Sequence, residues 1–495
     1  MDQSHLSLLE DHLTAPRGRG RLSRSPHAGT AGGAPCGDQI RIAVKIEGDR
    51  VAEAGFDAGG CAAARAAGSA VVELVRGAPL LDAARVTPAA VAGALGGLSP
   101  ERRHAADLAA DALHAAIGAA CRDGAPRLAP SEGRTLVAMS GGVDSAVAAH
   151  LALERGDEVV AVTLQLWSDP AGDGTLSCCS PQAVRTARAL AHGMGLPHVT
   201  LDLRDDFRQH VVDDFLEGQG TGLTPNPCVR CNGLVRFDSM VALADSLGAA
   251  RLATGHYARI ERDAHGPLLR VAADPRKDQA YMLARLEPHE LERLWFPLGG
   301  LEKPAVREIA REAGLPVADK PESQDLCFLA GLDRRRLVTP AGPGDIVDRT
   351  GRVVGRHHGH ESYTVGQRRG LGVAAHDPLY VLRKDARSNR LTVGPREALA
   401  TRSVSVSGAR LLRPGAAVDR VKLRYRSAPV SCRIEGDPPP GAHNRLTLEL
   451  GRAVDSAAPG QTACLMCGET VVGWATICEE GEGRSAARLE AADAA

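Results

Sequence analysis

The sequence predicts an α/β protein with a doubly wound parallel-sheet domain, preceded by a small α+β domain and followed by a small β module and a β-barrel-like domain. Three patterns carry this prediction. Between residues 135 and 329, apolar strand-like runs alternate with helical stretches, which is the order of βαβ units. Before this region, an alternating hairpin pattern leads into helical spacing. After residue 342, short alternating runs separated by Gly and Pro replace the helical signal.

The length of 495 residues allows three or four domains at about 150 residues each. We expect a disordered leader at 1–33, the small α+β domain at 34–124, the α/β domain at 131–335, the central small β module at 336–400, the C-terminal β-barrel-like domain at 401–480, and a disordered tail at 481–495.

The leader and the first domain differ in periodicity. Residues 1–33 are rich in Ser, Gly, Arg and His without a sustained pattern, which is typical of disorder. From Ile40, the run IRIAVKIEGDRVAEAGFDAGG alternates apolar and polar residues around a Gly-Asp turn, which predicts a β-hairpin. Residues 62–98 and 100–120 then have helical spacing.

Four apolar runs mark the strands of the parallel sheet: TLVAM, EVVAVTLQLW, HVTLDL and RLATGH. Helical stretches such as 146–154 and 182–194 separate them. The later runs GDIVDRTGRVVG, LYVLRKDARSNRLTVG, DRVKLRYRSAPVSCRIEG and TVVGWATI predict the small β module and the barrel.

Composition limits the function classes. A formal net charge of -1 gives no overall basic signature, so any nucleic acid must be held by local basic surfaces. No run of 18 apolar residues and no apolar signal-peptide core is present, so we expect a cytoplasmic protein without a membrane partner. In that compartment the 12 cysteines would be reduced, and they are candidates for metal, redox or catalytic roles.

The strongest local motif is Ser140-Gly141-Gly142-Val143-Asp144-Ser145, directly after a predicted strand and before a predicted helix. Glycines permit a tight turn, and the free N–H groups and dipole of a helix N-terminus attract phosphate. The motif lacks the Walker lysine and differs from the dinucleotide fingerprint. A Gly-rich turn that only caps a helix is the alternative.

This loop resembles the SGGxDS pyrophosphate loop of ATP-pyrophosphatases. Further motifs follow in order: TPNPCVRCN at 224–232, ATGHYAR at 253–259, KDQAYML at 277–283, FPLG at 296–299, ESQDLCFL at 322–329, YTVGQRRGLG at 363–372, KLRYRS at 422–427 and PGQ at 459–461. Together they resemble the tRNA-specific 2-thiouridylase family over residues 133–478.

The resemblance implies ATP-dependent 2-thiolation of the wobble uridine of tRNA, with Mg²⁺. It implies an ATP site at Ala138, Met139, Ser140, Gly141, Gly142, Val143, Asp144, Ser145, Leu164 and Gly255. It implies tRNA contacts at His256, Lys277, Asp278, Gln279 and Gln461. A buried histidine is the alternative for His256. Arg424 and Tyr425 are predicted to bind phosphate or stack on a base, with a solvated strand face as the alternative.

Two cysteines match the family's thiol pair. Cys327 matches the persulfide carrier, and Cys231 matches the thiol that attacks it. The uridine C2 oxygen would become an adenylate, and sulfur would then displace AMP. The chain departs from the commoner pattern at Cys228, where Asp often stands. Cys228, Cys231 and Cys327 would fit three corners of an iron–sulfur cluster whose fourth iron binds sulfide, so both mechanisms stay open.

The first domain has its own set of ligand residues: Cys36, Asp38, Cys61 and His104. Their motifs resemble the U-type iron–sulfur scaffold family over residues 31–120. Ala105 stands where that family has a third cysteine. Zinc binding, a labile cluster and a docking role all stay open, and a cysteine desulfurase or another sulfur donor is the implied partner.

Two other functions remain as alternatives. One is a different ATP-pyrophosphatase, which would not require Cys231 and Cys327. The other is an iron–sulfur or sulfur-relay scaffold whose nucleotide loop only gates binding.

Overall fold

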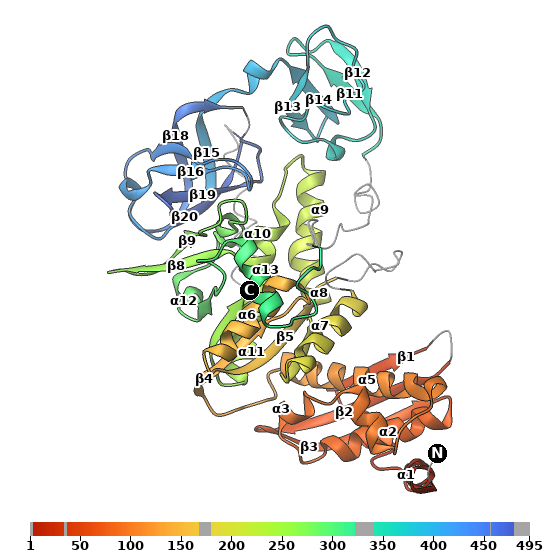
Figure 1. Ribbon diagram of the computed structural model, residues 1–495. Coiled ribbons are helices and arrows are strands. Elements are labelled where there is room, and N and C mark those ends of the chain that lie inside the picture. The colour runs from red at the N-terminus through yellow and green to blue at the C-terminus, as the bar shows by residue number, and fades with distance from the viewer. Residues whose placement is uncertain (1–2, 34–36, 168–179, 322–340, 456, 480–495) are drawn as a thin grey trace. The chain divides into compact units, whose positions relative to one another are not determined.

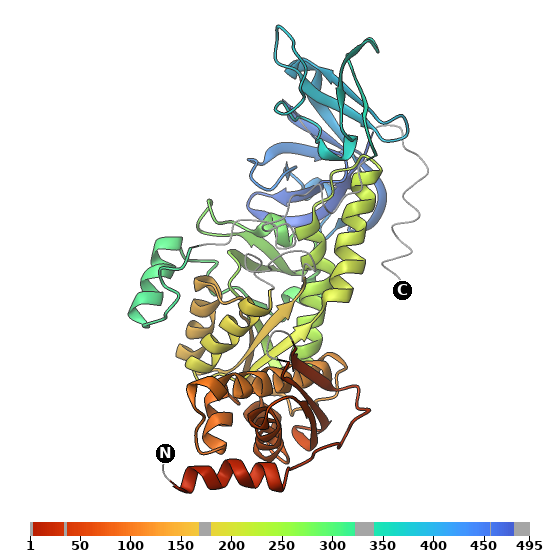
Figure 2. The ribbon, with the colours of Figure 1, turned by 90° about the vertical axis from the view of Figure 1, so that its right-hand side faces the viewer.

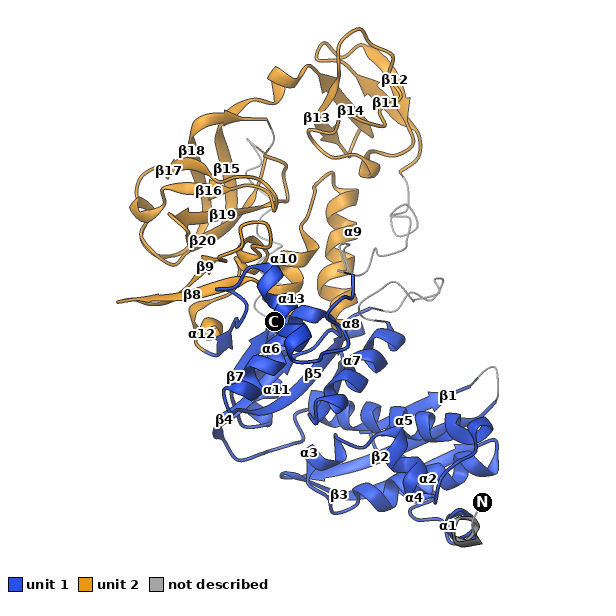
Figure 3. Ribbon diagram, in the orientation of Figure 1, with its two compact units in different colours: residues 1–204, 236–256, 293–328 blue, residues 205–235, 257–292, 329–495 orange. Residues whose placement is uncertain are grey.

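The computed structural model describes the chain except for residues 1–2, 34–36, 168–179, 322–340, 456 and 480–495. The chain forms two compact units (Figure 3). The first comprises residues 1–204, 236–256 and 293–328, and the second comprises residues 205–235, 257–292 and 329–495.

The first unit begins with a three-stranded antiparallel sheet in the order β1-β2-β3 (Figure 1). Its strands are β1 (Ala28–Gly32), β2 (Gln39–Glu47) and β3 (Arg50–Gly59). The helices around it are α1 (Gln3–Thr14), α2 (Ala62–Val75), α3 (Leu80–Ala83), α4 (Pro88–Ala94) and α5 (Arg103–Arg122). The β2–β3 pairing from Gln39↔Gly59 to Glu47↔Arg50 confirms the predicted hairpin.

The prediction of a disordered leader at residues 1–33 is wrong. Residues 3–14 form α1, and residues 28–32 form β1, which pairs with β2 from Ala28↔Ala43 to Gly32↔Gln39. His12 of α1 is buried, and its Nδ1 lies 2.9 Å from Ser69 Oγ of α2. This segment is ordered by partners that are distant in sequence, and its own periodicity carries no sign of them.

The same unit contains the predicted parallel sheet, in the order β10-β7-β4-β5-β6. Its strands are β4 (Ser131–Ala138), β5 (Glu158–Gln165), β6 (His198–Asp202), β7 (Ala249–Thr254) and β10 (Leu294–Trp295). The helices between them are α6 (Val143–Glu154), α7 (Pro181–Gly193), α11 (Phe237–Ser246) and α13 (Lys303–Glu312). From β4 the chain first adds β5 and β6 on one side of the sheet and later adds β7 and β10 on the other side. The order in which strands are added therefore reverses at β4, and parallel sheets bind ligands at such a point.

Helix α5 joins the two sheets of the first unit. It contacts β1, β2 and β6, and Figures 1 and 2 show it along the face of the N-terminal domain that lies toward the parallel sheet. The backbone N–H of His198 in β6 donates to the Ala84 carbonyl at 3.1 Å. The edge of the parallel sheet is therefore covered, which protects it from pairing with other chains.

The second unit begins within α8 (Arg204–Phe207) and continues through a π-helical turn into α9 (Asp213–Gly220) and α10 (Pro227–Cys231). It also contains the hairpin β8 (Ala258–Asp263) and β9 (Gly266–Val271), and the short α12 (Pro288–Leu291). A four-stranded sheet in the order β12-β11-β14-β13 forms the central module. Its strands are β11 (Gly344–Val347), β12 (Val353–His357), β13 (Tyr380–Asp385) and β14 (Arg390–Gly394).

The C-terminal strands close into a six-stranded barrel, because β15 pairs with both β18 and β20. They are β15 (Thr401–Leu411), β16 (Arg420–Lys422), β17 (Val430–Ile434), β18 (Gly441–Val454), β19 (Thr462–Cys467) and β20 (Thr470–Ile477). Alternate residues such as Val404, Val406 and Leu448 fill its core. The predicted barrel is confirmed, and the tail at 481–495 lies outside the described residues.

No helix in the described part of the chain has the length and apolar character needed to span a membrane.

Candidate functional site

The nucleotide loop follows β4 and leads into α6. Gly141 has a φ of 72°, a conformation that favours glycine, and Gly142 is the N-cap of α6. Ser145 braces the turn, since its hydroxyl donates to the Gly142 carbonyl at 3.0 Å and accepts from the Ser140 N–H at 3.2 Å. The loop thus places a helix N-terminus at the carboxyl edge of the sheet, a geometry that binds phosphate.

Two lysines that the motifs did not identify reach this loop. Lys303, the first residue of α13, lies 2.6 Å from the Asp144 carboxylate and is largely buried. The Nζ of Lys320 donates to the Gly141 carbonyl at 2.9 Å. Lys303 follows the FPLG motif and Lys320 precedes the ESQDLCFL motif, and this nearness to the two motifs was the only sequence signal for these lysines. They bring positive charge to the place where phosphate charge would lie.

The other residues predicted for ATP come from neighbouring strands. Ala138 pairs with Val162 of β5 and with Thr254 of β7, so Leu164 and Gly255 lie just beyond at the same edge. A Cβ at Gly255 would lie 2.8 Å from the Ser145 nitrogen, so the loop after β7 packs closely on the start of α6. The structure therefore brings the predicted ATP residues together.

His256 lies next to this edge. Its Nδ1 is 2.8 Å from Thr254 Oγ1, and its ring lies 5.8 Å from Phe237 and 6.2 Å from Phe296. Burial, aided by the Arg236 charge, lowers the pKa of His256 to about 3. The imidazole is consequently neutral near pH 7.

In the second unit, α10 carries Cys228 and Cys231. Pro227 opens the helix, and the Asn226 side chain caps it by accepting from the Cys228 and Val229 N–H groups at 3.2 and 3.3 Å. Cys231 is buried and Cys228 is half-buried. Residues three apart share one face of a helix, so the two thiols are neighbours. Cys327 lies outside the described residues.

A pair of tyrosines lies in the same unit as these cysteines. Tyr281 is fully buried, and its hydroxyl donates to the Thr462 carbonyl at 2.9 Å. The half-buried Tyr425 has its ring centroid 6.3 Å from that of Tyr281. Burial raises the pKa of Tyr425, and the charges of Asp278 and Cys228 contribute in the same direction. Tyr425 therefore presents a neutral aromatic ring within electrostatic range of Cys228.

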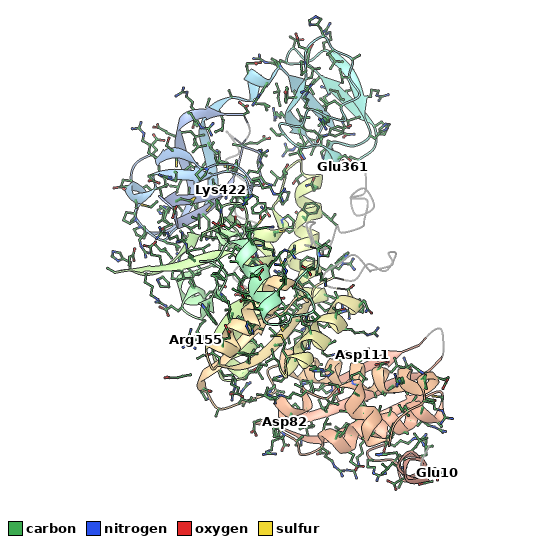
Figure 4. All side chains as sticks on the ribbon, in the orientation of Figure 1. Glu10, Asp82, Asp111, Arg155, Glu361 and Lys422 are labelled. Carbon is green, nitrogen blue, oxygen red and sulfur yellow. The ribbon has the colours of Figure 1, made fainter. Side chains whose placement is uncertain are left out.

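Two residues of the KDQ motif, Asp278 and Gln279, form hydrogen bonds within the protein. The Oδ1 of Asp278 accepts from the Ala272 and Ala280 N–H groups, and its Oδ2 lies 3.3 Å from Lys422 Nζ (Figure 4). Gln279 accepts from the Tyr257 N–H at 2.9 Å. Lys277 is half-buried in the adjoining turn, and Arg424 is exposed.

Gln461 is also engaged. Its side-chain amide donates to the Thr224 carbonyl at 2.6 Å.

The candidate metal site of the N-terminal domain is assembled around Asp38. The carboxylate oxygen Oδ2 lies 3.0 Å from Cys61 Sγ and 2.7 Å from His104 Nε2. One ligand atom from each of the three residues lies within 4.8 Å of the others. A Cβ at Gly60 would overlap the Asp38 carboxylate, so the turn needs glycine. Cys36 lies outside the described residues.

Burial and hydrogen bonding set the protonation of this group, and a metal would displace the protons that His104 and Cys61 hold. The Cys61 hydrogen bond lowers the pKa of Asp38, the Asp38 hydrogen bond raises the pKa of His104, and burial raises the pKa of the Cys61 thiol. The Glu101 carbonyl, 2.9 Å from His104 Nδ1, orients the ring. Ala105 is fully buried and offers no ligand. The described set of one sulfur, one oxygen and one nitrogen fits zinc.

Four family models match the chain. They are the NifU-like N terminal domain over residues 7–122, the tRNA methyl transferase HUP domain over 133–331, the tRNA methyl transferase PRC-barrel domain over 335–395, and the aminomethyltransferase beta-barrel domain over 413–477.

Similar curated proteins span either the whole chain or its last three domains. The bifunctional protein NifU/MnmA of Rubrobacter xylanophilus is 45% identical over 94% of this chain and 97% of its own length. The tRNA-specific 2-thiouridylases MnmA of Geobacter metallireducens and Zymomonas mobilis are 42% and 43% identical over 69% and 70% of this chain and 95% and 93% of their own.

Proposed function

The chain belongs to the tRNA-specific 2-thiouridylase family with a fused NifU-like domain, and we propose that it uses ATP to thiolate the wobble uridine of tRNA at C2. The observation that carries this proposal is the SGGVDS loop, which puts a helix N-terminus and Lys320 at the carboxyl edge of a parallel sheet. We also propose a cytoplasmic location for the protein.

The reaction divides into two transfers. In the first, the uridine C2 oxygen attacks the α-phosphate of ATP and pyrophosphate leaves. The N–H groups of the Ser140–Ser145 loop, Lys303 and Lys320 would neutralise the pyrophosphate, with Mg²⁺ as the expected counter-ion. In the second, a sulfur nucleophile attacks C2 and AMP leaves with the former oxygen.

Two sources of that sulfur remain in the proposal. In the first, Cys327 carries a persulfide whose terminal sulfur attacks C2, and Cys231 then attacks the bridging sulfur, which breaks the S–S bond and leaves a Cys231–Cys327 disulfide. In the second, Cys228, Cys231 and Cys327 hold an iron–sulfur cluster that supplies sulfide. The neighbouring Cys228 and Cys231 on α10 suit either account.

Recognition of tRNA would combine stacking with polar contacts. Tyr425 offers a neutral ring, within electrostatic range of Cys228, on which an extruded uridine can stack, and the exposed Arg424 offers a charge for phosphate. His256, Lys277, Asp278 and Gln279 remain proposed contacts from the family resemblance.

A metal is also proposed for the N-terminal domain. Cys61, Asp38 and His104 would hold zinc, with Cys36 as a fourth ligand, and the metal would fix the three turns that carry them. A labile cluster is the alternative. Zinc analysis of the purified protein and of Cys61→Ser, Asp38→Asn and His104→Gln tests this: about one zinc per chain in the parent, and loss in all three variants, is expected. A cysteine desulfurase or another donor is the proposed sulfur source.

The central test measures 2-thiouridine directly. Protein purified without oxygen is incubated with unmodified tRNA, Mg-ATP and sulfide, and the nucleosides are analysed by mass spectrometry. Thiouridine in the parent and its loss in Cys327→Ser is the expected result, and further loss in Cys228→Ser favours the cluster. No thiouridine from any donor, despite bound ATP, would contradict the proposal. Absence of pyrophosphate release would then favour the scaffold alternative, and pyrophosphate release that does not depend on tRNA would favour another ATP-pyrophosphatase.

A further inference from the structure

The segment that joins α9 to α10 is held by hydrogen bonds from both β domains of the second unit. This link runs from Gly220 to Asn226 and leads directly to Cys228. Two residues of the central module and two of the barrel bind its backbone: His360, Lys384, Pro459 and Gln461.

The central module binds the end of α9. The Nε2 of His360 lies 3.1 Å from the Gly220 carbonyl, and the Nζ of Lys384 donates to the Leu223 carbonyl at 3.2 Å. Both side chains are buried. Gly220 is the last residue of α9, and the last carbonyls of a helix lack partners within the helix, so a side-chain donor from outside satisfies this one. The Leu223 carbonyl lies beyond the end of the helix, in the link itself.

His360 is built into this position. Its Nδ1 lies 3.1 Å from Asn389 Oδ1, and the Asn389 amide donates to the Gly342 and Pro343 carbonyls, which identifies that oxygen. Both ring nitrogens therefore face oxygen atoms, which fixes the orientation of the ring. The Glu361 carboxylate lies 3.5 Å from His360 Nδ1 in the same module (Figure 4).

The barrel forms hydrogen bonds with both the N–H and the carbonyl group of Thr224. The Thr224 N–H donates to the Pro459 carbonyl at 2.8 Å, and the Gln461 amide donates to the Thr224 carbonyl. A Cβ at Gly460 would lie 2.9 Å from the Thr224 nitrogen, so glycine permits this approach. The turn is itself fixed to β20, because Ile477 exchanges backbone hydrogen bonds with Gly460 and Gln461 at 2.8 Å.

The residues between Thr224 and Cys228 have little conformational freedom. Pro225 packs against Gly218 of α9 so closely that a Cβ there would overlap the proline ring. Asn226 then caps α10 through the Cys228 N–H. Only three residues separate Thr224 from Cys228, and a proline and a capped helix restrict them.

We propose that Gln461 and His360 are positioning residues for Cys228, and that Gln461 acts on sulfur transfer through Thr224 in addition to the tRNA contact that the family resemblance implies. This inference rests on the proposed function. In this proposal, the central module and the barrel together hold α10, the helix that carries Cys228, in place.

The test compares Gln461→Leu and His360→Phe with the parent. Gln461→Leu keeps size and removes the donor, while His360→Gln restores one donor to the Gly220 carbonyl. Arg433→Gln, an exposed ion-pair variant of the same barrel, is the matched control. Three quantities are measured: tRNA affinity by filter binding, 2-thiouridine yield in a single turnover, and the iodoacetamide alkylation rate of Cys228 by peptide mass spectrometry without tRNA.

In Gln461→Leu and His360→Phe we expect thiouridine formation lower by roughly 10- to 100-fold and a several-fold change in the Cys228 alkylation rate, with the tRNA affinity of His360→Phe within about twofold of the parent. His360→Gln should recover much of the loss. Unchanged alkylation in Gln461→Leu would leave Gln461 only a tRNA contact and overturn the proposal, as would no change in any quantity. Should the parent form no thiouridine, the alkylation rates still test the positioning.

Discussion

The backbone of Gly118 in α5 lies directly against the Thr200 carbonyl of β6, and a Cβ at residue 118 would overlap that oxygen. One turn of α5 thus touches the edge of the parallel sheet without an intervening side chain. Asp111, also on α5, binds both Arg185 and Arg188 of α7 (Figure 4). In the first unit, the NifU-like domain is therefore packed against the nucleotide-binding sheet, which differs from a domain on a free tether.

Gly118→Ala should destabilise the first unit. The added methyl group must push α5 away from β6, and overpacking of this kind costs about 1–3 kcal/mol. Urea unfolding followed by circular dichroism measures the change in the free energy of unfolding.

Gly93→Ala is the matched control for this prediction. Gly93 lies in α4, where a Cβ would meet no atom within 4 Å, so alanine there should be neutral or stabilise the helix by up to about 1 kcal/mol. Equal effects of the two substitutions would show that the α5–β6 contact contributes nothing beyond helix propensity.

The parts predicted from sequence are those coded by neighbouring residues. The SGGVDS turn, the hairpin around Gly48-Asp49 and the alternation of β4, α6 and β5 each follow from local spacing. The predicted helical stretch 182–194 corresponds to α7, which begins with a proline after its cap Ser180.

The missed features depend on residues far apart in the sequence. Helix α1 is ordered by Ser69 of α2, and Lys303 and Lys320 reach the nucleotide loop from more than 150 residues away. Gln461 belonged to a recognised motif, yet its partner Thr224 was visible only in the structure. Local spacing carries no information on such contacts.

Acid should destabilise the first unit through its buried histidines. Burial lowers the pKa of His114 and His198 well below the ordinary value and that of His256 to about 3. Below pH of about 6.5 the unfolded chain binds protons that the folded chain does not, so stability falls as pH falls, by at most about 1.4 kcal/mol per pH unit for each histidine. Urea unfolding at pH 7.5, 6.5 and 5.5 measures this slope.

His256→Gln should reduce that slope by one proton. His376→Gln provides the comparison, because the His376 side chain is 99% exposed and its change should leave the slope as in the parent. If the slope of His256→Gln equalled that of the parent, the neutral state assigned to His256 would be wrong.

Lys320→Met should impair adenylation. The ammonium group next to the Gly141 carbonyl lies where the pyrophosphate would develop charge, and loss of one such group costs about 100-fold or more in rate. tRNA-dependent pyrophosphate release measures kcat/KM for ATP. Lys320→Arg retains the charge and should recover part of the rate. Arg311→Gln removes a positive charge from an exposed ion pair of α13, so it controls for a general loss of surface charge. An unchanged rate in Lys320→Met would exclude this role.

Tyr425 should contribute through its ring and not through its hydroxyl. Burial raises the pKa of Tyr425, so the phenol stays neutral, and the ring centroid lies 6.3 Å from that of Tyr281. Tyr425→Ala should weaken tRNA binding or single-turnover thiolation by the equivalent of about 1–3 kcal/mol, the range measured for loss of one base–aromatic stack, while Tyr425→Phe should behave like the parent. ATP binding without tRNA should be the same in all three proteins. Equal loss in the Ala and Phe variants would assign the effect to a hydroxyl contact, because only the hydroxyl is missing from both.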